Sequence, residues 1–122
     1  MVAQVLRKKI EEVANKKGWK TTFSEQYDET VIEFENYTNV GQNLIVTIFI
    51  NDDSSIQDVV NSIHKYWESF DTDYEASLWI GPDGHGKNGA PYHISDIIED
   101  MKDAENMIEE LFKEFQKNKD YD

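Results

Sequence analysis

The chain of 122 residues contains no cysteine. That absence excludes disulfide frameworks, thiolate nucleophiles and zinc sites ligated by cysteine. Long apolar runs are missing as well, because the longest one, Leu44 to Ile50, is interrupted by Thr47 and falls far short of the roughly 20 residues that span a bilayer. Met1 leads into an amphipathic segment instead of a signal sequence. We therefore expect a cytoplasmic protein that makes no contact with a membrane.

Basic residues are scarce, with 12 lysines and arginines against 25 aspartates and glutamates, a net charge of −13. The imbalance is uneven. Residues 1–22 carry six basic and two acidic side chains, whereas residues 23–110 carry three basic and 20 acidic ones. A field of that sign repels nucleic acid and attracts basic protein surfaces. We expect a partner with a basic, nucleic-acid-binding surface and no direct contact with nucleic acid, and the opposite charge of the first segment leaves a homodimer open.

The first half of the chain reads as one helix followed by three strands. Apolar residues recur at three- and four-residue steps over residues 3–17, which predicts a helix, and Gly18 ends it. Alternating apolar residues then predict strands over residues 19–23 and 31–37. The segment 44–50 is apolar on both parities, which predicts a third antiparallel strand that is covered more fully than its neighbours.

The second half is mainly helical. Periodic apolar residues predict helices over residues 55–69 and 94–117, whereas the short segment 73–80 fits either a helix or a strand. We expect an α+β fold with an N-terminal helix, a three-stranded antiparallel sheet and two or three C-terminal helices packed on one face. It forms a single domain over residues 1–117, followed by a polar tail over residues 118–122.

The loop over residues 81–93 holds four of the six glycines and both prolines. Its segment Gly81-Pro-Asp-Gly-His-Gly-Lys87 follows the spacing of a phosphate-binding loop up to Asn88, where that motif needs a hydroxyl for magnesium. Pro91 also interrupts the helix whose N-terminus would hold the phosphates. The sequence therefore predicts no nucleotide cofactor.

Catalytic and metal-binding patterns are absent in the sequence. Asp83, His85 and His93 share the loop without the spacing of a metal motif, so we predict no metal site. His64 lies between apolar neighbours of a predicted helix and is expected to be structural. Most acidic residues fall on polar faces, where a solvated carboxylate is a poor general acid or base. We predict that the protein is not an enzyme.

Acidic residues recur on one side of the C-terminal helix. At 100° per residue, six of them fall within an arc of about 100°: Asp96, Glu99, Asp100, Asp103, Glu110 and Glu114. Such residues lie about 6 Å apart along a helix, and Glu33 and Glu35 lie about 6.6 Å apart along a strand face. Phosphates of one DNA strand lie roughly 6–7 Å apart. Stiffly held carboxylates at this interval can mimic DNA, and a solvated helix face is the alternative interpretation.

Three patterns stand between Phe70 and Glu105: Phe70-Asp71-x-Asp73-x-Glu75-Ala76-x-x-Trp79, Gly86-x-x-Gly89-x-Pro91 and Ile94-x-x-Ile97-x-x-Asp100. This stretch resembles small acidic proteins of prophages and conjugative elements of gut-type Gram-positive bacteria. The predicted order of a basic helix, three strands and acidic helices is similar to small anti-CRISPR proteins, and the composition is similar to anti-restriction DNA mimics. The resemblance implies an inhibitor that fills the DNA groove of a CRISPR or restriction nuclease.

The stripe and the resemblance together define ten candidate partner-binding carboxylates: Glu33, Glu35, Asp71, Asp73, Glu75, Asp96, Glu99, Asp100, Asp103 and Glu110. An alternative function is a protein–protein adaptor that uses the aromatic segment from Tyr74 to Tyr92. Trp67 and Phe70, on the apolar face of the second helix, are expected in the core.

Overall fold

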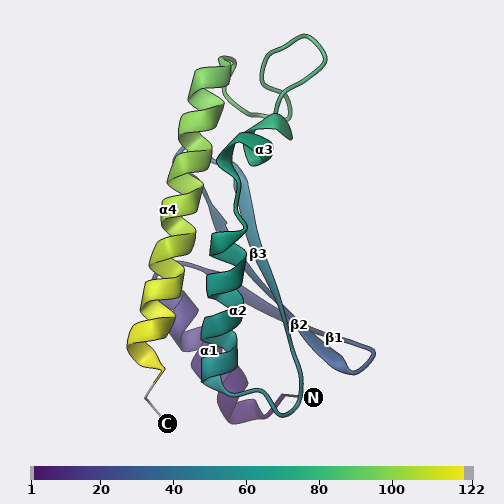
Figure 1. Ribbon diagram of the computed structural model, residues 1–122, viewed down its shortest axis with the longest axis vertical. Helices are drawn as coiled ribbons and strands as arrows, with labels where there is room; N and C mark the ends of the chain where they lie inside the picture. Colours follow the sequence, from purple (N-terminus) through teal and green to yellow (C-terminus); the bar gives the residue numbers. More distant parts are fainter. Residues whose placement is uncertain (1, 120–122) are drawn as a thin grey trace.

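The computed structural model describes residues 2–119 and has an α+β fold. The elements are α1 (Gln4–Asn15), β1 (Lys20–Gln26), β2 (Glu29–Tyr37), β3 (Asn43–Ile50), α2 (Ile56–Glu68), α3 (Thr72–Ser77) and α4 (Ile94–Asn118). The strands form one antiparallel sheet in the order β1-β2-β3. The helices lie on one side of that sheet, with α4 running along the length of the molecule (Figure 1). The predicted fold class is confirmed.

Backbone geometry at two positions explains where the first elements end. Gly18 adopts a φ of +82° directly after α1, a left-handed conformation that glycine takes without a steric penalty and that stops the helix before β1. The β1–β2 hairpin turns through Tyr27 and Asp28, and Tyr27 has a φ of +56°. Two-residue hairpins need positive φ in this turn because its twist then matches that of the strands.

The core lies between the sheet and helices α1, α2 and α4. At its centre, the rings of Phe34 on β2 and Phe115 on α4 meet edge to face, with their centroids 5.6 Å apart. Both side chains are fully buried, and Ile10 of α1 and Ile63 of α2 are buried in the same cluster. A residue of β2 and one residue from each of α1, α2 and α4 thus belong to the same core cluster.

Strand β3 differs from the prediction. Leu44, Val46 and Ile48 face the helices and are buried, but Phe49 remains 56 % exposed and Ile45 is exposed as well. The strand is covered more fully than β1, which has no buried residue, but not more fully than β2, so the expectation holds for one of its two neighbours in the sequence of strands. Helices pack on one face only, so the second apolar set of β3 lies on the open face of the sheet (Figure 1). Apolar residues at both sets of alternating positions in β3 therefore do not mean that both faces of the strand are buried.

The structure bears on two further expectations, one for residues 73–80 and one for the C-terminal tail. Residues 73–77 are helical, because α3 covers Thr72–Ser77 and Asp71 caps it by accepting hydrogen bonds from two backbone N–H groups. β pairing in the segment is limited to an isolated bridge between Ile80 and Gly86. At the other end, α4 is one helix as far as Asn118, whose side chain is buried. The polar tail expected from residue 118 thus starts inside the helix, and residues 120–122 lie outside the described part of the chain.

Candidate functional site

The ten candidate carboxylates do not share one surface. Glu33 and Glu35 flank Phe34, which points into the core, so their side chains point to the opposite, open face of the sheet. The other eight belong to α3, to its N-cap or to α4, on the helical side of the sheet. A single ligand that lies along α4 therefore cannot also contact the pair on β2.

Asp100 is buried instead of exposed. Its side chain is 3 % accessible, and its Oδ2 accepts a hydrogen bond of 2.8 Å from the hydroxyl of Thr38 in the β2–β3 turn. Its Oδ1 has no hydrogen-bond partner among the described residues. Burial raises the pKa of this carboxyl, while the hydrogen bonds from Thr38 and from the Val40 backbone lower it and the charge of Asp103 raises it, with a net upward shift. The prediction that Asp100 belongs to the contact surface is therefore wrong. Its buried side chain instead attaches the β2–β3 turn to α4.

The C-terminal end of the predicted stripe is also covered. Glu114 is buried, and its carboxylate accepts a hydrogen bond of 2.7 Å from the side-chain amide of Asn118. The ammonium group of Lys16, just past α1, donates to the same side chain of Asn118 at 3.0 Å. The helical stripe thus divides into buried structural members and exposed ones, because the β2–β3 turn covers one end and the α1 region the other.

The exposed part of the stripe is smaller than expected. Asp96, Glu99 and Glu110 are exposed, whereas Asp103 is half-buried and accepts a hydrogen bond of 3.1 Å from Asn39. Lys102 lies 4.0 Å from Glu99, and both side chains are well exposed. An exposed pair of this kind contributes about 0–1 kcal/mol, so it leaves Glu99 available to a partner.

Helix α3 adds one more exposed carboxylate, Asp73. The other two acids of this segment have local roles: Asp71 caps α3, and Glu75 lines a hollow of about 250 Å³ together with Tyr66 and Trp79. Burial raises the pKa of Glu75, and the nearby charge of Asp71 raises it further. Burial, followed by the charge of Glu75, also raises the pKa of the Tyr66 phenol.

Negative charge is concentrated toward one end of the molecule. Helix α3 packs against α4 near its first turns, at the end of the molecule farthest from α1 (Figure 1). Residues 70–105, at that end, include nine acidic and two basic residues. We call the exposed carboxylates Asp73, Asp96 and Glu99 the acidic end. The basic residues of α1 lie at the opposite end, so they do not neutralise it.

Large apolar side chains are exposed at the same end. Tyr74 on α3 is 59 % exposed and Tyr92 in the loop is 61 % exposed, with Leu78 and Ile94 also exposed. Tyr92 stacks on His85, with ring centroids 3.9 Å apart. We call Tyr74, Leu78, Tyr92 and Ile94 the aromatic end. Tyr74, Leu78 and Tyr92 lie within the segment predicted for an adaptor, and Ile94 follows it.

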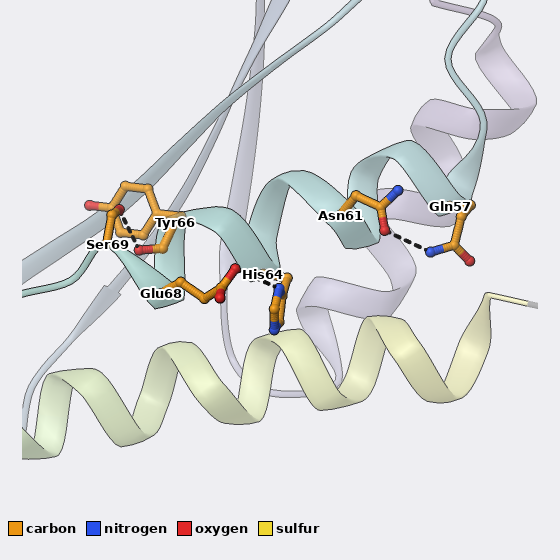
Figure 2. Close-up of polar contacts among 6 residues, drawn as sticks. All are labelled: Gln57, Asn61, His64, Tyr66, Glu68 and Ser69. Carbon is orange, nitrogen blue, oxygen red and sulfur yellow. Dashed lines mark hydrogen bonds and ion pairs between the residues drawn. The ribbon is translucent and has the colours of Figure 1, made fainter.

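The remaining aromatic and histidine residues have structural positions. Trp67 and Phe70 are half-buried and pack against the core, as expected. Figure 2 shows the His64 ring pointing from α2 toward α4, and the ring lies 4.8 Å from that of Phe112. Its Nδ1 lies 3.0 Å from a Glu68 carboxylate oxygen. Within residues 2–119, no three histidine or acidic side chains are grouped to hold a metal ion, and no helix of this part has the length and apolarity to cross a membrane.

Comparison with known proteins does not assign this chain to a family. No protein-family model, curated protein or solved structure matches this chain. The resemblance to mobile-element proteins and to DNA-mimic inhibitors therefore stays a prediction, and any functional argument rests on the geometry and charge described above.

Substituting Asp100→Asn is expected to change the pH dependence of folding. Because the folded-state pKa of Asp100 lies above its unfolded value, the native state binds more protons between the two values. The free energy of unfolding therefore rises as pH falls through the folded-state pKa. Asparagine keeps an acceptor for Thr38 and removes the buried charge, so the variant is expected to be more stable than the parent at pH 7 and to lose this rise.

Urea unfolding of both proteins between pH 7 and pH 4 measures this effect. Glu75 also has a raised pKa and contributes in the same direction in both proteins, so the difference between the two curves isolates Asp100. Parallel curves over the whole range contradict the prediction.

Proposed function

We propose that this protein is a non-enzymatic acidic binding protein whose acidic end contacts the basic, nucleic-acid-binding surface of another protein. The observation that carries the proposal is the concentration of negative charge at one end of the molecule: residues 70–105 hold nine acidic residues and two basic ones. A molecule whose negative charge is densest at one end approaches a cationic groove with that end first.

The contact surface proposed here is smaller than the full set of ten carboxylates. It consists of Asp73, Asp96 and Glu99, which are exposed, and leaves out Asp100, which is buried. Asp96 and Glu99 stand about one turn apart on a rigid helix, a spacing close to that of successive phosphates. Such a surface competes with DNA for the groove of a DNA-handling enzyme, such as a CRISPR or restriction nuclease.

Capture from a bacterial lysate, followed by displacement with duplex DNA, tests the proposal. The immobilised protein is expected to retain a nucleic-acid-binding protein at low salt, and excess duplex DNA is expected to elute it because both compete for one groove. Raising the salt concentration should release it as well. A partner that excess duplex DNA does not elute would contradict the proposal.

Two matched double variants locate the contact. Asp96→Asn with Glu99→Gln removes two negative charges from the acidic end, and Glu33→Gln with Glu35→Gln removes two from the open face of the sheet. The first pair is expected to weaken binding of the captured protein about tenfold at low salt, from two lost charge pairs of roughly 0.5–1 kcal/mol each. The second pair is expected to bind like the parent. Titration by calorimetry measures both, and equal losses would show that only net charge matters.

The exposed aromatic end supports a second candidate function, a protein–protein adaptor. Tyr74 and Tyr92 present large rings to solvent, and buried rings of this kind dominate many protein interfaces. In the capture experiment an adaptor retains its partner at high salt and is insensitive to duplex DNA. Trp79 packs against the core, so the exposed tyrosines are the residues to vary in that case.

A further inference from the structure

Strand β3 forms an outer edge of the sheet, and on its outer side no strand of residues 2–119 pairs with its backbone groups. At the β2–β3 turn, the N–H of Thr38 donates to the carbonyl of Gln42 at 2.9 Å, which makes these two residues a hydrogen-bonded pair. Pairs alternate along an antiparallel ladder. With the observed register, residues 44, 46, 48 and 50 direct their backbone groups to β2, and residues 45, 47 and 49 direct theirs to the outer edge.

Both ends of this edge are capped by side chains. The hydroxyl of Tyr66 donates to the carbonyl of Ile45 at 2.9 Å, and the N–H of Asn51 donates to the hydroxyl of Ser54 at 3.0 Å. Between these caps, the outward N–H and carbonyl groups of Thr47 and Phe49 have no hydrogen bond to another residue of the described chain. We call the stretch from Thr47 to Phe49 the β3 edge.

The β3 edge lacks the usual protection against pairing. Proteins block an edge strand with lysine, proline, an inward charge or a covering element, and the segment Leu44 to Ile50 contains no charged residue and no proline. Tyr66 of α2 and Ser69 just after its end lie on the side turned toward the strands, whereas His64 points to α4 (Figure 2). Helix α2 therefore stands beside the edge without covering it.

Two hollows give access to the same edge. One, of about 490 Å³, is lined by Thr47 and Phe49 of the strand and by Lys65, Tyr66 and other residues of α2. A second, of about 720 Å³, shares Phe49 and Lys65 with the first. Its charged lining consists of four acidic residues and one lysine: Glu29, Asp53, Asp58, Glu68 and Lys65. The edge is thus open, and the acidic lining lies at its Phe49 end, whereas Lys65 is the charged residue lining the hollow at Thr47.

We propose that the β3 edge binds an extended, basic segment of a partner protein, which joins the sheet as a fourth strand. The backbone groups of Thr47 and Phe49 supply the pairing, and the acidic lining selects basic side chains. A second copy of this chain is disfavoured, because edge-to-edge pairing would bring two acidic linings together. This site goes beyond the proposed function, since it shares no residue with the acidic end.

A short synthetic peptide in which lysine and valine alternate, acetylated and amidated at its ends, is the probe for this site. Binding is expected to slow hydrogen exchange at the amides of Thr47 and Phe49, which point outward in the free protein, and to leave the already protected amides of Val46 and Ile48 unchanged. A peptide with glutamate in place of lysine, and one with methylated backbone amides, are expected not to bind.

Substituting Thr47→Pro removes the outward N–H without removing a ladder bond to β2, and it is expected to weaken peptide binding by about tenfold or more. Thr47→Val is the matched control, because it keeps the amide and a β-branched side chain, and it is expected to bind normally. Retained binding by Thr47→Pro overturns the proposal. If that variant does not fold, full binding of the methylated peptide to the parent overturns it equally.

Sedimentation of the free protein supplies an independent check. A dimer that Thr47→Pro converts to a monomer would assign the edge to a second copy and would overturn the basic-peptide proposal. Neutralising the acidic end by Asp96→Asn with Glu99→Gln is expected to leave binding of the lysine–valine peptide within about twofold of the parent. The two functional proposals therefore fail separately.

Discussion

Substituting Phe115→Ala is expected to remove about 3–5 kcal/mol from the free energy of unfolding, a large share of the roughly 5–15 kcal/mol typical of a domain. Phe115 is fully buried on α4, and its ring meets that of Phe34 edge to face. Truncation leaves a cavity between the sheet and the longest helix, which cannot collapse because α1 and α2 fix α4 on either side. Urea unfolding measures this loss, and the slope of the free energy of unfolding against urea concentration is expected to stay unchanged.

The same chemical change on the open face is the control. Phe49→Ala removes a ring that is 56 % exposed, so we expect a loss of about 1 kcal/mol or less. Combining Phe34→Ala with Phe115→Ala is expected to cost less than the sum of the two single changes, since each already removes the ring contact of about 0.5–1.5 kcal/mol. Equal losses at Phe49 and Phe115 would contradict the placement of the core.

Substituting Gly86→Ala is expected to disrupt the loop that carries Tyr92 of the aromatic end. A Cβ at this position would lie 1.8 Å from the carbonyl oxygen of Pro91 and 2.8 Å from its carbonyl carbon. Both are backbone atoms, so the two sides of the loop must separate and the hydrogen bond from Gly86 N–H to the Tyr92 carbonyl must break. We expect a loss of about 3 kcal/mol or more, at the upper end for an overpacked site.

NMR spectra measure this local effect, because the stacked rings of His85 and Tyr92 shift each other's resonances and separation removes those shifts. Gly81→Ala in the same loop is the control: the nearest atom to its Cβ is a side-chain oxygen of Asp83 at 3.2 Å, which can rotate away. Unchanged ring shifts in Gly86→Ala would contradict the prediction. If the protein is an adaptor, Gly86→Ala also removes partner binding, whereas the DNA-competing activity of the acidic end persists.

The acidic stripe on α4 shows what the spacing of residues along a helix can and cannot predict. Angular positions correctly group Asp96, Asp100 and Glu114 on one side of α4, but an angle does not specify which neighbour covers that side. The β2–β3 turn buries Asp100 through Thr38, and the region after α1 buries Glu114 near Asn118. Both contacts join residues far apart in the sequence, so no local pattern signals them.

The β3 edge was missed for a related reason. The apolar residues of Leu44 to Ile50 on both parities favour a strand covered more fully than its neighbours, yet β3 is the last strand in the order and has no partner beyond it among residues 2–119. Strand order follows from which hairpins form and on which side the helices pack. An exposed Phe49 beside unpaired backbone groups could be recognised only once that order was known.

The sequence by itself determined the element order, the α+β class, the positions of the turns and the separation of basic from acidic residues along the chain, because periodicity, turn residues and charge are local properties. Only the tertiary structure decided which carboxylates stay in solvent, that Glu33 and Glu35 face away from α4, and that β3 keeps an open edge. Those outcomes depend on which distant segments pack together, and burial in the common core, not local preference, selects that packing.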